Sequence, residues 1–461
     1  MGTMPMPKLI FSMSLPAMLS MTIMAMYNVV DSIFVSRFDM NGLTAVNVGY
    51  PLQLLLIAAS VGTAIGVNSL VSRKLGERDF AMANSAATHG LVLGLFTYLF
   101  FLLFGLFGVR PMMSLFSSDE VVINYGVQYF TCVLCCSLFA IIQIMIEKTL
   151  QATGNMIYPM LFQLTGAVVN IIFDPLLIFG VGFFPRLGVL GAAIATVFGQ
   201  FCGMVFSIII LFAKKHYVTI DFKGFRLNAA TIKSIYTVGV PSIIMQSIGA
   251  VMMFGLNGIF RVVDSTVSIN VFGIYFKLQS FVFMPCFGLN QGVLPVIGYN
   301  YGARNKKRMY SALKIGIIIA LVIMAVGVTL MWLMPDRLLS LFGSEESFKN
   351  VSAEELMDVG QWAFRIVSLC FLPAAAGILF TTLFQAVGKG VRSMMMSICR
   401  QLLLLLPIAA LLTFTLGVRY VWFAFPIAEL GSLALAIAFF INLVKGDFKR
   451  LDAPAGLESK Q

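Results

Sequence analysis

Charged side chains are scarce in this sequence. They make up 11% of its 461 residues, whereas a soluble domain carries roughly a quarter. Hydrophobic residues make up 59%, and runs of about 20 or more of them, the length that a helix needs to cross a bilayer, follow one another along the chain. An ordinary soluble protein is therefore excluded, and the sequence predicts an all-α polytopic membrane protein.

Histidine is nearly absent, and cysteine occurs without a metal-binding pattern. The two histidines, His89 and His216, lie far apart in the sequence, which argues against a histidine metal site. All seven cysteines lie in or beside apolar runs and are expected to be small buried hydrophobes. The first apolar run, residues 9–36, is too long for a cleavable signal segment. We expect no resident cofactor.

Twelve spans can be drawn, and their order predicts the topology. Lysine and arginine, with Lys148 and Arg400 among them, gather on the side that holds the N-terminus, with a bias of roughly three to one. The positive-inside rule makes this side cytoplasmic, with both termini there. The net charge of +11 is therefore a topology signal and not a nucleic-acid signal. The spans begin near residues 9, 44, 85, 122, 157, 189, 235, 267, 310, 357, 394 and 419.

The two halves of the chain are related in sequence. At one constant offset in the numbering, Gly62 and Gly66 meet Gly288 and Gly292. Six spans in each half is an even number, so both halves enter the membrane from the same side, and a parallel repeat has a pseudo-two-fold axis along the membrane normal. The prediction is two six-helix bundles: an N-lobe over 1–213, a basic cytoplasmic linker over 214–234, and a C-lobe over 235–461.

A few acidic residues lie deep in the predicted spans. Asp31, Asp174 and Glu429 are the clearest, and Glu147 lies near a span end. A charge at mid-bilayer costs about 3 kcal/mol even on lenient scales, so it usually faces protein or water and marks function. Burial also favours the neutral form of a carboxylate, which allows it to exchange a proton.

Polar neighbours share helix faces with two of these acids. Asn170 and Asp174 are four residues apart, Asn28 and Asp31 are three apart, and Thr196 adds a hydroxyl. These oxygens suit a proton or a hard cation, and Na⁺ could be held by Asp31, Asn170, Asp174 and Thr196. The alternative is that the polar groups only tie helices together.

The repeat confines the acidic pair to the first half. Asp31 meets uncharged Asn257, and the region opposite Asp174 reads LLLLLPIAA. A coupling site in one lobe is the simplest interpretation. Pro16 lies inside the first span, on the N-terminal side of Asp31, and it predicts either a static kink or a hinge.

The candidates for a substrate cleft are less specific. Gln53 and Gln279 occupy equivalent repeat positions, and Asn257 is added as a polar residue within a span. Lys277 and Arg365 are cations inside spans of the second half, where each could pair with an acid or extend to the interface.

Several segments together resemble the MATE family of multidrug and toxic compound extrusion transporters, in a MepA-like bacterial branch. They include LPAMLSMTIMAMYNVVDSIFVSR, NIIFDPLLIFG, GAAIATVFGQ and GYNYGAR, in the family's order. The resemblance implies a multi-pass antiporter of the bacterial plasma membrane, and not an enzyme, that exports lipophilic organic cations in exchange for H⁺ or Na⁺. It implies a cation site at Asp31, Asn170, Asp174 and Thr196, and a bend at Pro16. A monomer is expected.

Two alternatives remain open at this point. A lipid or lipid-linked oligosaccharide flippase of the same superfamily should have more cations in its cleft. An intramembrane enzyme of the prenyltransferase kind would need a second acid-rich motif to bind Mg²⁺ and diphosphate, and the sequence has none.

Overall fold

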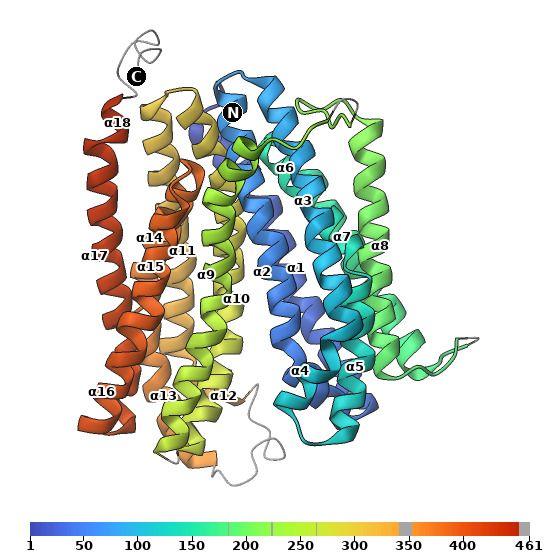
Figure 1. The fold of residues 1–461 in the computed structure, drawn as a ribbon. Helices are drawn as coiled ribbons and strands as arrows, with labels where there is room; N and C mark the ends of the chain where they lie inside the picture. The colour runs from blue at the N-terminus through green and yellow to red at the C-terminus, as the bar shows by residue number, and fades with distance from the viewer. Residues whose placement is uncertain (183, 223–224, 264, 341–352, 451–461) are drawn as a thin grey trace.

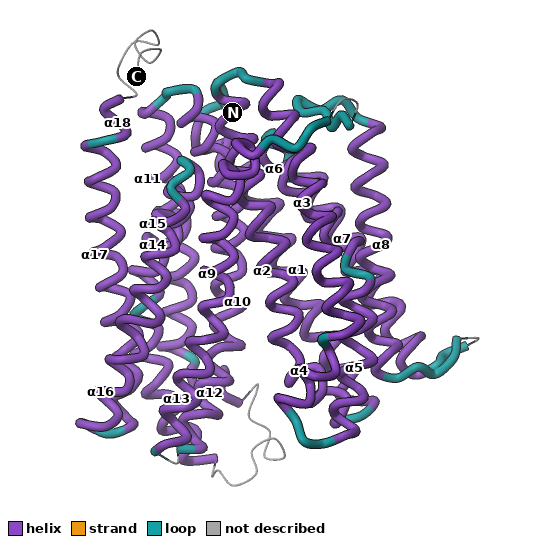
Figure 2. Tube along the Cα trace, viewed as in Figure 1, coloured by secondary structure: helices purple, strands orange, loops and turns teal. Residues whose placement is uncertain are grey.

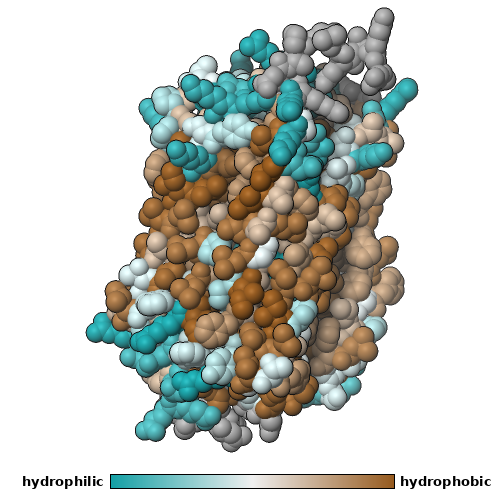
Figure 3. Space-filling model, turned by 90° about the vertical axis from the view of Figure 1, so that its left-hand side faces the viewer, coloured by the Kyte–Doolittle hydropathy of each residue, from teal (hydrophilic) through white to brown (hydrophobic). Residues whose placement is uncertain are grey.

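The computed structural model describes residues 1–182, 184–222, 225–263, 265–340 and 353–450, and these form a bundle of long helices with no strand among them (Figures 1 and 2). A broad hydrophobic band lies between two polar ends of the molecule (Figure 3). The N-terminus and the last described residues, 447–450, lie at one end of the bundle (Figure 1). We call this end the terminal face and the opposite end the far face.

The helices of the first half are α1 (Met6–Phe38), α2 (Met40–Gly76), α3 (Phe80–Phe107), α4 (Val109–Phe116), α5 (Glu120–Cys135), α6 (Leu138–Ala152), α7 (Ile157–Phe179) and α8 (Val189–Ala213). Those of the second half are α9 (Ala229–Val262), α10 (Thr266–Gly302), α11 (Lys306–Leu333), α12 (Pro335–Ser340), α13 (Ala353–Ser368), α14 (Phe371–Ala386), α15 (Gly390–Ile398), the π-helical η1 (Cys399–Leu405), α16 (Leu406–Leu416), the 3₁₀-helical η2 (Val418–Phe423), α17 (Ala424–Lys445) and α18 (Asp447–Arg450).

Ten helical segments of the described chain are long and apolar enough to cross a membrane, and two bent pairs complete the predicted twelve. Helices α5 and α6 meet at 47°, and α13 and α14 meet at 45°. The two bends fall at equivalent places in the two halves, which confirms the twelve-span, all-helical fold.

The repeat is also visible in the backbone. Arg78 and Arg304 are separated by the same offset as the paired glycines. Both adopt positive φ, at 61° and 55°. Gly154 and Gly388 do the same in their turns, at 92° and 81°. A left-handed conformation is uncommon for arginine, so its occurrence at both related positions shows that the two halves contain the same type of turn.

Three details differ from the sequence prediction. Helix α9 begins at Ala229, so the last part of the segment expected to be a linker is helical. Lys148 is buried within α6 and is not a loop cation. Arg400 lies ten residues into the candidate span Gly390–Leu416. Lys148 and Arg400 therefore lie inside the bundle, and neither indicates which side of the membrane is cytoplasmic.

Glycines of one half contact backbone of the other half near the terminal face. A Cβ atom added at Gly66 on α2 would lie 2.3 Å from the carbonyl oxygen of Ile235 on α9. A Cβ at Gly288 on α10 would lie 2.5 Å from the Cα atom of Met18 on α1. Gly66 and Gly292 are related by the repeat, as are Gly62 and Gly288, so the two crossings are equivalent. Such close approach requires glycine.

Two glycines near the far face have free space beside them. Among the described residues, no atom would lie within 4 Å of a Cβ added at Gly258 on α9 or at Gly273 on α10. The far portions of these helices therefore leave room beside them, whereas the portions near the terminal face are tightly packed between the halves.

Candidate functional site

The centre of the candidate site is a polar pair on α7. Asp174 is fully buried and Asn170 nearly so. The Nδ2 atom of Asn170 donates to Oδ1 of Asp174 at 3.2 Å, as expected for residues one helical turn apart, and to Oγ1 of Thr196 on α8 at 3.3 Å. The structure thus brings three of the predicted residues together.

Glycines allow α8 to approach α7 closely at this point. A Cβ atom at Gly199 would lie 2.5 Å from the carbonyl oxygen of Gly166 and 3.4 Å from the Cβ atom of Asn170. A Cβ atom at Gly191 would lie 2.5 Å from the carbonyl oxygen of Leu177. The small residues of the GAAIATVFGQ segment therefore place the Thr196 hydroxyl within reach of α7.

Asp31 completes the site from α1. Its carboxyl group lies beside that of Asp174. Two carboxyl groups that share one site do not readily ionise together, because like charges repel. The pair is therefore suited to hold a proton or a cation.

Several oxygens of the site have no partner in the described structure. They are Oδ1 of Asp31, Oδ1 of Asn170 and Oδ2 of Asp174, and all three atoms are buried. Buried polar atoms are nearly always hydrogen-bonded, and an exception calls for an explanation such as an ion or water. An all-oxygen donor set of this kind fits a proton or a hard cation such as Na⁺.

Two tyrosines beside the carboxyl groups were missed in the sequence. Tyr129 of α5 is buried beside Thr196. Tyr27 of α1 lies close to both Asp31 and Asp174. Tyr27 precedes Asp31 by one helical turn, so its spacing could have identified it. Nothing in the sequence indicates Tyr129, because α5 reaches the site only through the fold.

The last predicted member of the ion site, Asn28, cannot be placed, and the predicted cleft residue Asn257 lies outside the site. The side chain of Asn28 lies outside the described residues. Asn257, the repeat partner of Asp31, lies on α9 and is not brought to the carboxyl pair; its Oδ1 atom is buried and without a partner in the described structure. The acidic site itself belongs to the first half alone.

Lys277 lies on the face of α10 that is turned towards the first half. It is eleven residues before Gly288, which places the two about 20° apart around the helix, and Gly288 contacts Met18 of α1. Lys277 is exposed and has neither an ion pair nor a hydrogen bond to any described residue. Counted along the antiparallel α1, it lies at the depth of residue 29, near Asp31.

The other predicted cleft residues are oriented less favourably. Gln53 and Gln279 lie about 180° around their helices from Gly62 and Gly288, so they are turned away from the opposite half, and both are half-buried. Arg365, which was predicted only as a cation inside a span, is exposed on α13, three residues before the helix ends.

Pro16 lies where the two halves meet. Helix α1 continues through it. Ser14 and Met18, on either side of it, are the residues whose backbone meets Gly292 and Gly288 of α10. A change in the bend of α1 at Pro16 would therefore alter a contact between the halves.

The other deep acids are already paired. Oε1 of Glu429 lies 3.3 Å from Nη1 of Arg400. Oε1 of Glu147 lies 3.4 Å from Nζ of Lys148 and also accepts from Gln151 at 2.9 Å. These two carboxylates are compensated by cations, which distinguishes them from Asp31 and Asp174.

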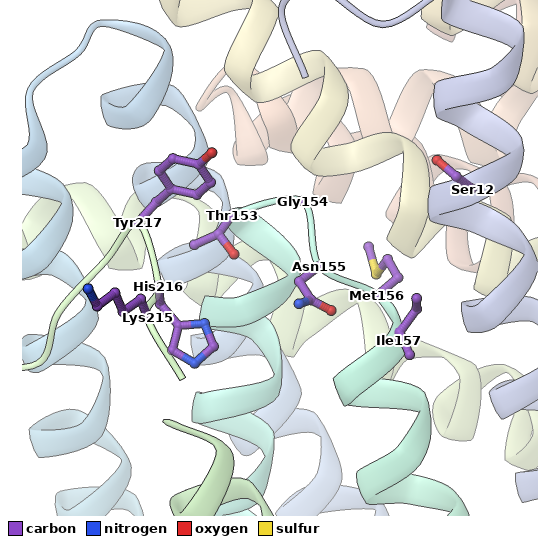
Figure 4. Close-up of a pocket in the computed structure, with 9 residues that line it drawn as sticks. All are labelled: Ser12, Thr153, Gly154, Asn155, Met156, Ile157, Lys215, His216 and Tyr217. Carbon is purple, nitrogen blue, oxygen red and sulfur yellow. The ribbon is translucent and has the colours of Figure 1, made fainter. Parts of the chain in front are cut away.

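A pocket of about 380 Å³ lies at the terminal face, between the α6–α7 turn, α1 and the segment after α8 (Figure 4). Its lining includes Thr153, Asn155, Lys215, His216 and Tyr217, and no carboxylate. It contains none of the predicted site residues.

Comparison with known proteins identifies relatives along the whole chain. The family model described as MatE matches residues 16–176 and 239–411, one segment in each half. The multidrug export protein MepA of Staphylococcus haemolyticus is 26% identical over 443 residues, covering 94% of this chain and 92% of the relative. An FAD transporter of Shewanella oneidensis is 24% identical over 429 residues, covering 92% of each chain.

Solved structures show the same fold. One described as the outward-facing conformation of a multidrug resistance MATE family transporter has a TM-score of 0.88 and 26% identity, over 96% of both chains. A second, a transporter from Pyrococcus furiosus described as having a reversed polarity of its binding pocket, has a TM-score of 0.88 and 25% identity, over 97% of both chains.

Proposed function

The chain belongs to the MatE family, and on this basis we propose that it is a secondary transporter that exports amphipathic organic cations in exchange for H⁺ or Na⁺. The observation that carries the proposal is the Asp31–Asp174 pair, with partnerless buried oxygens beside Asn170 and Thr196. The names of the relatives, multidrug export proteins among them, support an exporter.

The mechanism uses the two halves as moving units, residues 1–213 and 235–461, with 214–234 between them. The terminal face is cytoplasmic and the membrane is the bacterial plasma membrane. The contacts between the halves near the terminal face, together with the room beside Gly258 and Gly273, correspond to a conformation open to the far face. The protein acts as a monomer.

The carboxyl pair couples the ion to the substrate. Ionised Asp31 and Asp174 attract a cationic substrate that enters from the cytoplasm. After the halves reorient, H⁺ or Na⁺ from outside neutralises the pair and weakens its attraction for the substrate, which leaves. The ion must bind the two conformations differently to drive the cycle, and the compact oxygen cluster provides a site that a shift of α1 against α7 would change.

A second candidate substrate class is favoured by Lys277. This exposed ammonium faces the first half at the depth of Asp31, where it would attract an anionic group and repel a cation. A relative named as an FAD transporter and a solved relative with reversed pocket polarity are consistent with anionic cargo on this fold. A zwitterionic substrate would satisfy both Lys277 and the carboxyl pair.

The test is efflux of ethidium from proteoliposomes, driven separately by a Na⁺ gradient and by a pH gradient. We expect one gradient to drive efflux, and Asp31→Asn and Asp174→Asn each to abolish it while the protein remains folded. Asp119→Asn is the matched control, because Asp119 is an exposed helix cap and asparagine caps equally well. Normal transport by both site variants would refute the coupling assignment and favour a lipid flippase.

A further inference from the structure

A cluster of buried polar side chains joins the two halves near the terminal face. Nζ of Lys148 on α6 donates to Oε1 of Gln291 on α10 at 2.5 Å, and Nε2 of Gln151 donates to the same oxygen at 3.1 Å. Lys148 and Gln151 belong to the first half, and Gln291 belongs to the second. One glutamine oxygen thus accepts two hydrogen bonds from the opposite half, one of them from an ammonium group.

Glu147 holds the donors in place. Its carboxylate lies 3.4 Å from the Lys148 ammonium and accepts from Gln151 at 2.9 Å and from Gln163 of α7 at 3.0 Å. Lys148, Glu147 and Gln151 are each at most 5% exposed. A hydrogen bond to a charged group is worth more than a neutral one, and a buried charge that loses its partners is costly.

The same cluster extends along the seam between α1 and α7 towards the carboxyl pair. Gln163 lies seven residues before Asn170 and is hydrogen-bonded to Ser20 of α1. Ser20 lies eleven residues before Asp31. Each spacing places its two residues within about 20° on one helix face, so Ser20 and Gln163 lie on the same seam as Asp31 and Asn170.

We propose that Ser20, Glu147, Lys148, Gln151, Gln163 and Gln291 form a cross-half polar cluster that keeps the terminal face closed and responds to α1–α7 packing at the carboxyl pair. Opening towards the terminal face separates Gln291 from Lys148 and Gln151. A shift of α1 against α7, caused by ion binding or release at Asp31 and Asp174, moves Ser20 and Gln163, and through Glu147 it changes the position of the Lys148 ammonium.

The repeat shows that this arrangement belongs to the first half. In the register that sets Gly154 against Gly388, Glu147 and Lys148 correspond to Thr381 and Thr382, which carry no charge. Gln151 corresponds to Gln385, whose side chain donates to Ser242 within its own half at 3.1 Å. The buried ion pair is thus absent from the repeat-related position, as expected for a switch controlled by the first half.

The test measures the conformation and needs neither an ion gradient nor a substrate. Ser72 of α2 is fully buried against Gly298 of α10 near the terminal face, and Gly273 lies in open space on the far side. Ser72→Cys and Gly273→Cys are therefore reporters of opening at the two faces. Their modification by a membrane-permeant maleimide is followed by peptide mass spectrometry, which separates them from the seven native cysteines.

Gln291→Leu removes the acceptor of both cross-half hydrogen bonds. We expect labelling at position 72 in the Ser72→Cys reporter to rise by about tenfold and that of the Gly273→Cys reporter to fall. Gln291→Glu keeps the acceptor oxygen and adds a charge opposite Lys148, so labelling at position 72 should fall below that of the parent. Gln385→Leu removes a buried amide side chain whose hydrogen bond, to Ser242, lies within its own half, and it leaves the backbone carbonyl that accepts from Ser69 in place. It should change neither reporter.

The outcomes separate the alternatives. Faster modification at both positions in Gln291→Leu would indicate that this variant has lost its fold. In that case, labelling at position 72 in Gln291→Glu decides whether the proposal stands. Unchanged labelling at position 72 in both Gln291 variants would overturn the proposal. Although the proposal rests on the transporter function proposed above, such a result would leave the efflux test unaffected, and a failure of gradient-driven efflux would leave the labelling result standing.

Discussion

The guanidinium group of Arg400 lies 3.3 Å from the carboxylate of Glu429, and this pair joins η1 to α17 inside the second half. The side chain of Glu429 is 10% exposed and that of Arg400 is 29% exposed. Removal of one partner leaves a charge in apolar surroundings without compensation, whereas removal of both leaves none.

We therefore expect Arg400→Met and Glu429→Gln each to destabilise the protein by about 2 kcal/mol, and the double variant to be more stable than either single variant. Thermal unfolding in detergent, followed for all four proteins, measures this difference. A double variant whose loss equals the sum of the single losses would show that the two charges do not interact.

This pair also shows where the sequence is insufficient. The sequence places Arg400 among the cytoplasmic cations because the ends of a span cannot be fixed by hydropathy when the polar residue lies near one of them. Its location becomes clear only from the fold, in which a π-helical turn at residues 399–405 lies beside Glu429 of α17. Pairing between residues so far apart along the chain has no sequence signature.

Other features were predictable for a physical reason. The twelve spans could be predicted because hydrophobic runs long enough to cross a bilayer are visible in the sequence. The repeat could be predicted because glycines recur at related positions, where only glycine allows two helices to approach closely. Asn170 and Asp174 were grouped correctly because one helical turn separates them. Tyr129 and the cross-half cluster around Gln291 were missed because they depend on contacts between distant helices.

The glycines near the terminal face provide a second prediction. A Cβ atom at Gly76 would lie 2.0 Å from the carbonyl oxygen of Tyr299, and one at Gly302 would lie 2.0 Å from that of Arg73. We expect Gly76→Ala and Gly302→Ala to prevent closure at this face, and so to reduce gradient-driven efflux by at least roughly tenfold while the protein remains folded.

Gly258→Ala is the matched control, because an added methyl group there would meet no atom within 4 Å. It should transport like the parent, or be slightly more stable because alanine favours the helix. Efflux from proteoliposomes and thermal unfolding are measured together. Wild-type efflux in both Gly76→Ala and Gly302→Ala would mean that the helices can separate here without loss of function.

Lys277 leads to a prediction about selectivity. If its ammonium faces the substrate, Lys277→Gln should weaken transport of an anionic or zwitterionic compound and should improve transport of a monovalent cation such as ethidium, because repulsion is removed. We expect a change of about tenfold between the two classes, which corresponds to a charged interaction of about 1.4 kcal/mol. Competition for transport between FAD and ethidium in proteoliposomes measures it.

Arg365→Gln is the control for this change, since Arg365 is also an exposed cation of the second half but lies on α13, away from the α10 face that contacts α1. It should leave the ratio of the two substrates unaltered. An equal effect of both substitutions would point to the general charge of the second half and not to a specific contact at Lys277.

The hydroxyl group of Thr196 provides the final prediction. Its Oγ1 atom accepts from Asn170 at 3.3 Å and lies beside the buried Tyr129, so it lies among the oxygens proposed to hold the coupling ion. Thr196→Val retains the shape and removes the oxygen. We expect the concentration of the coupling ion needed for half-maximal efflux to rise by about tenfold, whereas Thr196→Ser, which keeps the hydroxyl, should resemble the parent.

The shift caused by Thr196→Val should differ in size between Na⁺ and H⁺ as the coupling ion. Na⁺ needs several oxygen ligands, so the loss of one weakens its binding directly, whereas a proton resides on a carboxyl group and depends on Thr196 only through the Asn170 side chain. A large shift under a Na⁺ gradient would therefore assign Thr196 as a ligand. Identical ion dependence of the valine, serine and parent proteins would exclude its hydroxyl from the site.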